Sequence, residues 1–287
     1  MNPLWVSLSA YGGVTTLQAL SVLWAAGIRQ VELAIGVKPS PDTVEVLRHY
    51  QQQGMQYRAH HAFVWIGQRS FNLAQSFDAS YFERLTDWLV TMDITAYSVH
   101  AGSFSPSDDP KAAYARFLQN VEQLGQLCSD RGIRLGVETM YPPELDSTSQ
   151  YLLQNTAQVE QLLQDLPHVE LEVDMAHLNI WKKETIPEKL QLLELACDSD
   201  SEALASLRGS ALPPTAARLL EIHISDNDSY RDSHTAISDR TWWVPYAATF
   251  PPLVPLVLES RMNRQSALAV RQQIEVTQSL LSVRASG

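Results

Sequence analysis

The segment Leu219–His234, with the sequence LLEIHISDNDSYRDSH, carries side chains that can bind a metal ion or transfer a proton. Apolar residues alternate with Glu221 and His223, and this period of two predicts a strand with one apolar and one polar face. The polar face runs directly into a cluster of imidazoles and carboxylates. The members of this cluster are His223, Asp226, Asp228, Asp232 and His234.

Other predicted strands also end in an ionisable side chain. Carboxylates and imidazoles that converge from separate strands repel one another or lose their hydration unless a cation lies between them. A divalent metal ion is the simplest such cation, so the pattern predicts a metal site. The ionisable residues at strand ends or just beyond them are His61, His100, Glu138, Asp174, His177, His223 and Glu259, with Asp232 and His234 in the following loop.

Strand-like and helix-like runs alternate along the whole chain, which predicts parallel strands joined by helical crossovers. The fold class is therefore α/β, and eight such units predict a single (β/α)8 TIM barrel over residues 1–287, with an elaborated loop and helix region at about 180–214. In such a barrel the carboxyl ends of the strands share one mouth, where the site is built. The predicted strands are Leu4–Ser9, Gln30–Ile35, Gln56–His61, Ala96–Ala101, Ile133–Thr139, Val169–Asp174, Leu220–Ser225 and Val254–Ser260.

A second polar layer is expected deeper in the barrel. If Glu138 points inward, Arg134 does too, and Glu172 shares its face with Asp174. We expect Arg134 to pair with Glu172 or Glu221 beneath the site and to orient its ligands. The simpler alternative is that these side chains are solvated at the bottom of the barrel.

Composition restricts the partners and the location. The chain has 287 residues and a formal net charge of −11. Because the sequence has no basic stripe to offset this charge, we expect no nucleic-acid partner. No secretory signal and no apolar run of membrane-spanning length is present, so a cytoplasmic protein without a membrane partner is expected.

Several motifs give the chain a resemblance to the xylose isomerase-like TIM-barrel superfamily. This superfamily contains sugar and sugar-phosphate isomerases and epimerases, hydroxypyruvate isomerase, inosose dehydratase and endonuclease IV. The resemblance covers nearly the whole chain. The matching motifs are SVHAGS at His100, GVET at Glu138, DMAH at Asp174 and His177, HISDND with RDSH from His223 to His234, LVLES at Glu259, and HHAF with FNLA near His61.

The resemblance implies an enzyme of carbohydrate metabolism, a sugar or sugar-phosphate isomerase or epimerase, with a small carbohydrate as substrate. One divalent ion (Mn, Mg, Co or Zn) would be held by Glu138, Asp174, His223 and Glu259. Proton transfer would proceed through a metal-stabilised enediolate. Glu138 and Glu259 would serve as acid and base, and His177 would contact a substrate oxygen. The epimerases carry an arginine shortly after the strand-seven histidine, and here Arg231 stands at a shifted position.

Endonuclease IV offers an alternative, a hydrolase that cleaves a small phosphoester with two or three zinc ions. The resemblance supplies a match to each of its nine zinc ligands: His61, His100, Glu138, Asp174, His177, His223, Asp232, His234 and Glu259. Dehydratase or aldolase chemistry and a metal-free binding barrel are further alternatives. Under the isomerase interpretation, His61, His100, Asp232 and His234 would contact substrate or an additional metal, and Trp65, Trp181 and Arg231 would line the pocket. A homo-oligomer is left open.

Overall fold

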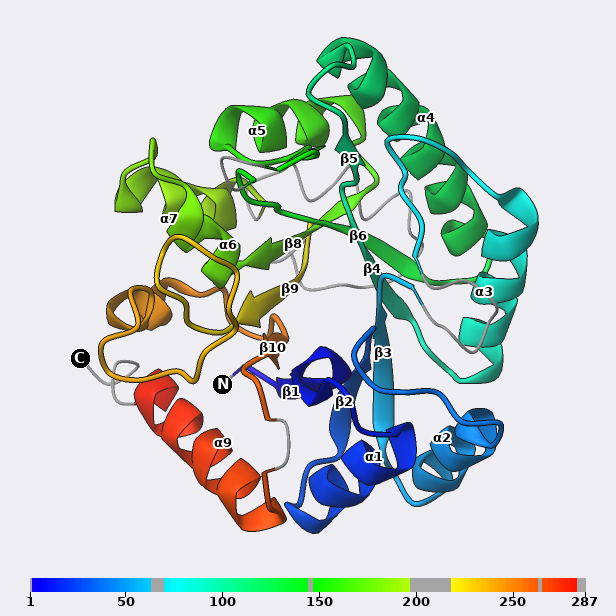
Figure 1. The fold of residues 1–287 in the computed structure, drawn as a ribbon, viewed down its shortest axis with the longest axis vertical. Coiled ribbons are helices and arrows are strands. Elements are labelled where there is room, and N and C mark those ends of the chain that lie inside the picture. The colour runs from blue at the N-terminus through cyan, green and yellow to red at the C-terminus, as the bar shows by residue number, and fades with distance from the viewer. Residues whose placement is uncertain (1, 63–69, 144–146, 197–217, 263–264, 283–287) are drawn as a thin grey trace.

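Eight parallel strands close into one barrel in the computed structural model, which describes residues 2–62, 70–143, 147–196, 218–262 and 265–282. Neighbouring strands follow the order β1, β10, β9, β8, β6, β4, β3, β2, and the helices lie outside them (Figure 1). The predicted (β/α)8 TIM barrel is therefore confirmed. The barrel strands are β1 (Leu4–Ser7), β2 (Gln30–Leu33), β3 (Gln56–His60), β4 (Ala96–His100), β6 (Arg134–Glu138), β8 (Glu170–Asp174), β9 (Leu219–Ile224) and β10 (Leu256–Leu258).

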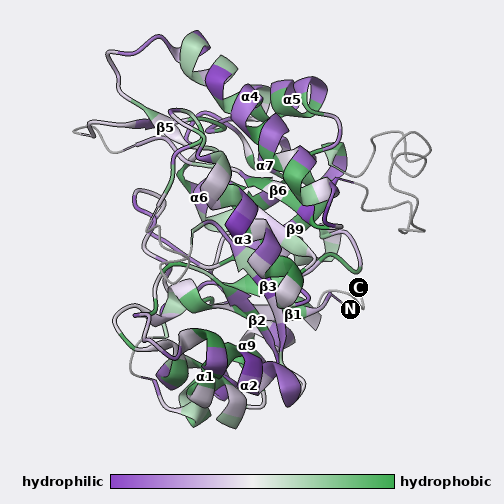
Figure 2. Ribbon diagram, turned by 90° about the vertical axis from the view of Figure 1, so that its right-hand side faces the viewer, coloured by the Kyte–Doolittle hydropathy of each residue, from purple (hydrophilic) through white to green (hydrophobic). Residues whose placement is uncertain are grey.

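The outer helices have one face on the barrel and one in solvent, and they carry both hydrophobic and hydrophilic residues in Figure 2. In α4, for example, Phe117, Val121 and Leu124 are buried whereas Glu122 is exposed. No helix among the described residues is long and apolar enough to cross a membrane. The helices are α1 (Thr16–Ala25), α2 (Thr43–Gln52), α3 (Ala79–Thr91), α4 (Pro110–Ser129), α5 (Thr156–Asp165), α6 (Met175–Ile180), α7 (Ile186–Leu195) and α9 (Ala267–Ser282).

Smaller elements explain where the predicted bounds differ. The predicted strand Leu4–Ser9 ends at Ser7 because a 3-10 turn, η1 (Leu8–Tyr11), follows it. A second 3-10 segment, η4 (Val244–Thr249), precedes β10, and β5 (Ser103–Phe104) pairs with β7 (Gln150–Tyr151) outside the barrel. Much of the predicted elaborated region at about 180–214 lies outside the described residues, which break off after residue 196.

Helix starts carry their capping signals in the sequence. Thr15 accepts a hydrogen bond from the Gln18 amide, and the Gln18 side chain accepts one from the Thr15 amide, which forms a capping box at α1. Asp109 caps α4, and Pro110 follows at its first position. These local signals fix where the chain leaves each loop and thereby help to set the strand positions.

Two ion pairs lie in the lower interior of the barrel: one is buried on both sides, and the other has an arginine side chain that is 34% exposed. Arg58 lies against Glu221, and their side chains are 3% and 0% exposed. Arg134 forms a two-pronged pair with Glu170. The prediction that Arg134 pairs with Glu172 or Glu221 is therefore wrong. Glu170 lies on β8 two residues before Glu172, on the same face, and is therefore nearer to the level of Arg134 on β6.

An extra residue in β9 sets the phase of the inward side chains. Leu171 pairs with Leu219, but Glu172 pairs with Glu221, so Leu220 forms a bulge. The Leu220 side chain lies beside Gly136, where an added Cβ would come within 2.7 Å of Leu220 Cδ2. The bulge thus brings Glu221 and His223 level with the inward carboxylates of β8.

The Arg58–Glu221 pair gives a stability prediction. Arg58→Leu leaves the Glu221 carboxylate buried without its cation, and we expect the free energy of unfolding to fall by about 3–5 kcal/mol. Urea unfolding followed by circular dichroism measures this loss. The double variant Arg58→Leu/Glu221→Leu removes the stranded charge and should recover most of the stability. A double variant no more stable than the single one would contradict this account.

Candidate functional site

The carboxyl ends of the strands converge on a cavity of about 190 Å³ at the mouth of the barrel. Two predicted residues, Asp174 and His223, do not line this cavity and have fully buried side chains. Both contact residues that do line it. The structure therefore brings all nine histidines and carboxylates predicted for the site into one cluster. Those in the cavity wall are His61, His100, Glu138, His177, Asp232, His234 and Glu259.

The four residues predicted to hold a metal come from four consecutive strands of the barrel: Glu138 from β6, Asp174 from β8, His223 from β9, and Glu259 from the end of β10. Donor atoms of Asp174, His223 and Glu259 lie within 4.8 Å of one another. Donor atoms of Glu138, Asp174 and His177 form a second such group, which shares Asp174.

Asp174 is aimed by the helix that follows it. Its Oδ1 caps α6, accepting hydrogen bonds from the amides of Ala176 at 2.6 Å and His177 at 3.0 Å. Its Oδ2 is buried and has no hydrogen-bond partner. One oxygen is therefore used to fix the side chain, and the other is available to the cluster.

The Asp-x-x-His spacing places His177 on the first turn of α6, above Asp174. His177 Nδ1 lies 2.7 Å from the carbonyl oxygen of Thr139 and 3.1 Å from Glu138 Oε1. Its Nε2 lies 3.4 Å from Asp232 Oδ2. His177 thus connects the metal-capable carboxylates of the strands with the loop after β9.

The carboxylates of the loop after β9 fall into two groups, and those of the first group hydrogen-bond within the loop. Asp226 accepts hydrogen bonds from the Asn227 amide and the Thr241 hydroxyl, and Asp228 accepts from the amides of Tyr230 and Arg231. Both stabilise the loop itself.

Asp232 and His234, farther along the same loop, face the site. His234 Nε2 lies 2.9 Å from Asp232 Oδ2, and His234 Nδ1 lies 3.6 Å from Glu259 Oε2.

Three residues of the cluster, Glu32, His60 and Glu172, are absent from the set of site residues predicted from the sequence. Strand β3 ends at His60, one residue before the predicted end, so His60 points into the barrel. His61 has a positive φ of 55° and stacks on His100 with ring centroids 4.0 Å apart. The alternation that places Arg58 inside also places His60 inside, and this signal could have identified it.

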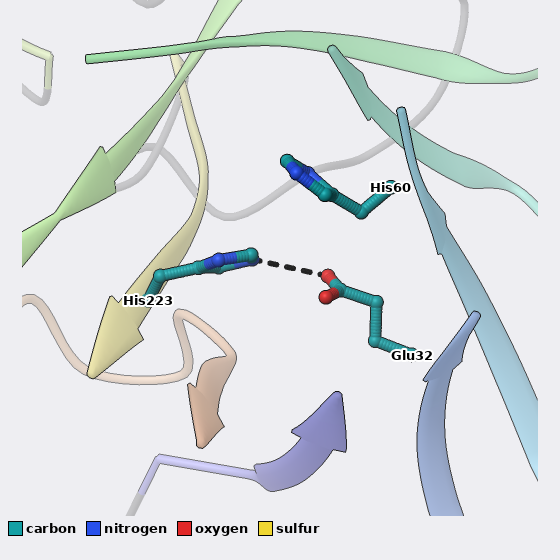
Figure 3. A group of neighbouring side chains, drawn as sticks. All are labelled: Glu32, His60 and His223. Atoms are coloured by element: carbon teal, nitrogen blue, oxygen red, sulfur yellow. Dashed lines mark hydrogen bonds and ion pairs between the residues drawn. The ribbon is translucent and has the colours of Figure 1, made fainter. Parts of the chain in front are cut away.

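His223 is enclosed by carboxylates on both ring nitrogens. Figure 3 shows Glu32, His60 and His223 converging from β2, β3 and β9. His223 Nε2 lies 3.1 Å from Glu32 Oε2. Its Nδ1 lies 2.9 Å from Glu172 Oε1 and 3.2 Å from Glu259 Oε2. If Nε2–H donates to Glu32, Nδ1 is the nitrogen that presents a lone pair to the cluster.

Trp181, which was predicted for the pocket, does not line this cavity. Trp181 is fully buried and donates its indole N–H to the carbonyl oxygen of Met140 at 2.7 Å. Together with Arg231, it lines a neighbouring, more open cavity of about 770 Å³. Trp65 lies outside the described residues.

A family model described as xylose isomerase-like TIM barrel matches residues 21–253. The chain belongs to this family. A search of curated proteins found no match. Among solved structures, a D-tagatose 3-epimerase-like protein is 14% identical with a TM-score of 0.72, covering 99% of this chain and 98% of its own.

Two further structures show the same fold. The 3-keto-D-glucoside 4-epimerase of E. coli is 14% identical with a TM-score of 0.63, and the alignment covers 97% of this chain and 100% of that one. An AP endonuclease of family 2 from Brucella melitensis is 14% identical with a TM-score of 0.66, covering 94% and 96%. At these identities the likeness establishes the architecture alone.

In this xylose isomerase-like barrel, burial and the charges of neighbouring residues raise the pKa of some site residues and lower the pKa of others. Burial and the nearby Glu172 raise the pKa of Glu138 to about 7. Burial also acts to raise the pKa of Glu259, but His223 and His234 hold it well below its usual range. Burial and the neighbouring His60 lower the pKa of His61 to about 3. The protonation of each group in the cluster therefore depends on the charges of its neighbours.

His234 allows a test of this coupling in metal-free protein. Burial disfavours its charged form, but the hydrogen bond to Asp232 and the charge of Glu259 raise its pKa to about 9. Because the unfolded value is about 6.5, the stabilisation is complete below about pH 6.5 and is lost as pH rises through about 9.

We expect His234→Gln to cost more unfolding free energy at about pH 6 than at about pH 10. Urea unfolding at both pH values, in the presence of a chelator, measures the two differences. His49→Gln, on the exposed face of α2, is the matched control. Equal costs at the two pH values would show that His234 is not held in its charged form.

Proposed function

We propose that this protein is a divalent-metal-dependent sugar isomerase or epimerase. The observation that carries the proposal is a set of buried donor atoms without hydrogen-bond partners: Glu138 Oε2, Asp174 Oδ2 and His223 Nδ1. A buried polar atom without a hydrogen bond costs about 1–3 kcal/mol, and more if it is charged. Glu138 Oε2 and His223 Nδ1 have ion-pair contacts, at 3.2 Å to His100 Nε2 and 2.9 Å to Glu172 Oε1, but no hydrogen bond. A metal ion would remove this cost. Carboxylate oxygens with one imidazole nitrogen fit Mn²⁺, Mg²⁺, Co²⁺ or Zn²⁺.

The ligands in this proposal are Glu138, Asp174, His223 and Glu259. A bound ion would supply Lewis-acid polarisation of a substrate carbonyl and its neighbouring hydroxyl. Glu138 and Glu259 would move the proton, since strands β8 and β9 separate them around the barrel and they can reach a substrate carbon from different sides. Ser9 Oγ donates to Glu259 Oε1 at 2.7 Å and holds that carboxylate in place.

His177 would orient a substrate oxygen from the wall of the cavity. Its ring nitrogens lie between Glu138 and Asp232, so its position is fixed from both sides. Two proteins with a similar fold support a carbohydrate substrate, since they are described as a D-tagatose 3-epimerase-like protein and a 3-keto-D-glucoside 4-epimerase. We infer a small, polar ketose, since the inner cavity of about 190 Å³ is lined mainly by imidazoles and carboxylates.

A second candidate is hydrolysis of a small phosphoester with two or three zinc ions. The observation that favours it is the overlap of three donor groups, which share Glu138 and Asp174 as bridges. A family 2 AP endonuclease has the same fold. The net charge of −11 disfavours a nucleic-acid duplex as substrate. The three groups are His60 with His100 and Glu138, Glu138 with Asp174 and His177, and Asp174 with His223 and Glu259.

Metal content distinguishes the two candidates. We expect elemental analysis of protein purified without chelator to find close to one Mn, Mg or Co ion per chain. Activity on ketoses should disappear after chelation and return when that metal is added back. Two or three zinc ions per chain would instead support phosphoester hydrolysis, and a protein that binds no divalent ion would contradict both.

The proton-transfer role of Glu259 gives a second test. Glu259→Gln keeps the shape of the side chain but removes the base, so exchange of the substrate C–H in heavy water should fall by roughly 10²- to 10⁴-fold. NMR of ketoses incubated with the enzyme measures the exchange, and circular dichroism checks the fold. Glu45→Gln, on the exposed surface of α2, is the control. Full exchange by Glu259→Gln would refute the acid–base assignment.

A further inference from the structure

We propose that Glu172, which lies outside the ligand set implied by the family resemblance, is itself a metal ligand. The inference rests on the proposed metal dependence and adds a residue to that same site. Glu172 lies on β8 two residues before Asp174, on the same inward face, and its side chain is fully buried. It is level with Glu138 on the neighbouring strand, with which it pairs in register.

The two carboxylate oxygens of Glu172 have different surroundings. Oε2 lies 3.1 Å from His60 Nδ1 in hydrogen-bonding geometry. Oε1 is buried without a hydrogen-bond partner, although His223 Nδ1 is only 2.9 Å away. One oxygen therefore fixes the side chain, and the other faces the cluster. Asp174 shows the same division between its capping oxygen and its unpaired oxygen.

The unpaired oxygen belongs to a compact set of donors. Glu138, Glu172 and His223 offer donor atoms that all lie within 4.8 Å of one another. Each of the three has a buried atom without a hydrogen-bond partner, namely Glu138 Oε2, Glu172 Oε1 and His223 Nδ1. Adjacent ligands of an octahedral ion with bonds of about 2.1 Å lie about 3 Å apart. The 2.9 Å between Glu172 Oε1 and His223 Nδ1 matches that spacing.

Groups from the opposite strands hold these donors in place. Glu32 engages Nε2 of His223 and leaves Nδ1 directed at Glu172, as Figure 3 shows for the Glu32 contact. His60 is positioned by Ser98 Oγ at 3.1 Å and lies 3.0 Å from His100, nitrogen to nitrogen. Metal ligands are commonly oriented by such outer hydrogen bonds.

The other inward carboxylates of the lower barrel are neutralised differently. Glu170 pairs with Arg134 and Glu221 with Arg58, so both have a permanent cation beside them. The partners of Glu172 are imidazoles, His60 and His223. An imidazole nitrogen can itself bind a metal ion, whereas a guanidinium offers no lone pair. Glu172 therefore lies among side chains that can all serve as metal ligands.

The test is metal binding by metal-free protein, not turnover. Mn²⁺ affinity is measured by calorimetry, and the ligand field is read from the visible absorption of the Co²⁺-loaded protein. Residues that only orient ligands typically change affinity by about 10- to 100-fold. We expect Glu172→Gln to weaken Mn²⁺ binding by more than roughly 100-fold. We also expect it to change the Co²⁺ spectrum at saturation.

The matched control is Glu170→Gln. This variant removes a buried carboxylate from the same strand, but one that pairs with Arg134. It should leave the Mn²⁺ affinity and the Co²⁺ spectrum as in the parent protein. An unchanged spectrum in Glu172→Gln would overturn the proposal, even if the affinity falls by 10-fold. If the parent protein binds no divalent ion, the proposed function itself fails, and that outcome is distinct from loss of the Glu172 contribution alone.

A second measurement needs no variant and covers the case in which Glu172→Gln does not fold. Anomalous diffraction from crystals of the parent protein loaded with Mn²⁺ locates the ion directly. A Glu172 oxygen within about 2.3 Å of the ion supports the proposal. An ion held by Asp174, His223 and Glu259 with Glu172 beyond bonding distance overturns it.

Discussion

The interior of this barrel is lined with carboxylates, and the fold depends on how their negative charges are separated or neutralised. Five acidic side chains lie around the imidazole of His223 at the inner end of the site: Glu32, Glu138, Glu172, Asp174 and Glu259. All are buried, so water cannot screen their repulsion. The barrel can close over such a group only if cations or protons accompany it. The distribution of arginines and histidines on the inward strand faces follows from this requirement.

The strand geometry places these residues, and it does so with little freedom. In parallel pairing, Asp174 is level with His223 and Glu138 is level with Glu172. The Leu220 bulge shifts β9 by one residue relative to β8, and without this shift His223 would point toward the helices. Gly136 leaves the space that the bulged leucine occupies. A residue with no chemistry of its own therefore controls whether the chemistry assembles.

Much of this could be predicted from the sequence, because strand alternation and helix caps are local signals. All eight strands were recognisable, and the strand-end residues, from Glu138 to Glu259, do converge. Contacts between side chains on different strands were harder to predict. The partner of Arg134 is Glu170, which depends on strand register, and the adjacent pair His60 and His61 hides which ring faces inward until the end of β3 is known. Asp226 and Asp228 look like ligands in the sequence but stabilise their own loop.

The two polar layers of the barrel differ in the kind of cation that balances them, and this difference has a functional meaning. Arginine stays charged at every accessible pH, so the lower pairs, Arg58 with Glu221 and Arg134 with Glu170, are permanent parts of the scaffold. Histidine can exchange its proton for a metal, so the proposed metal site around His223 can be balanced by either kind of cation. A barrel built in this way separates stability from chemistry along its axis. The fixed charges hold the strands, and the histidines of the upper layer lie at the cavity in the mouth of the barrel.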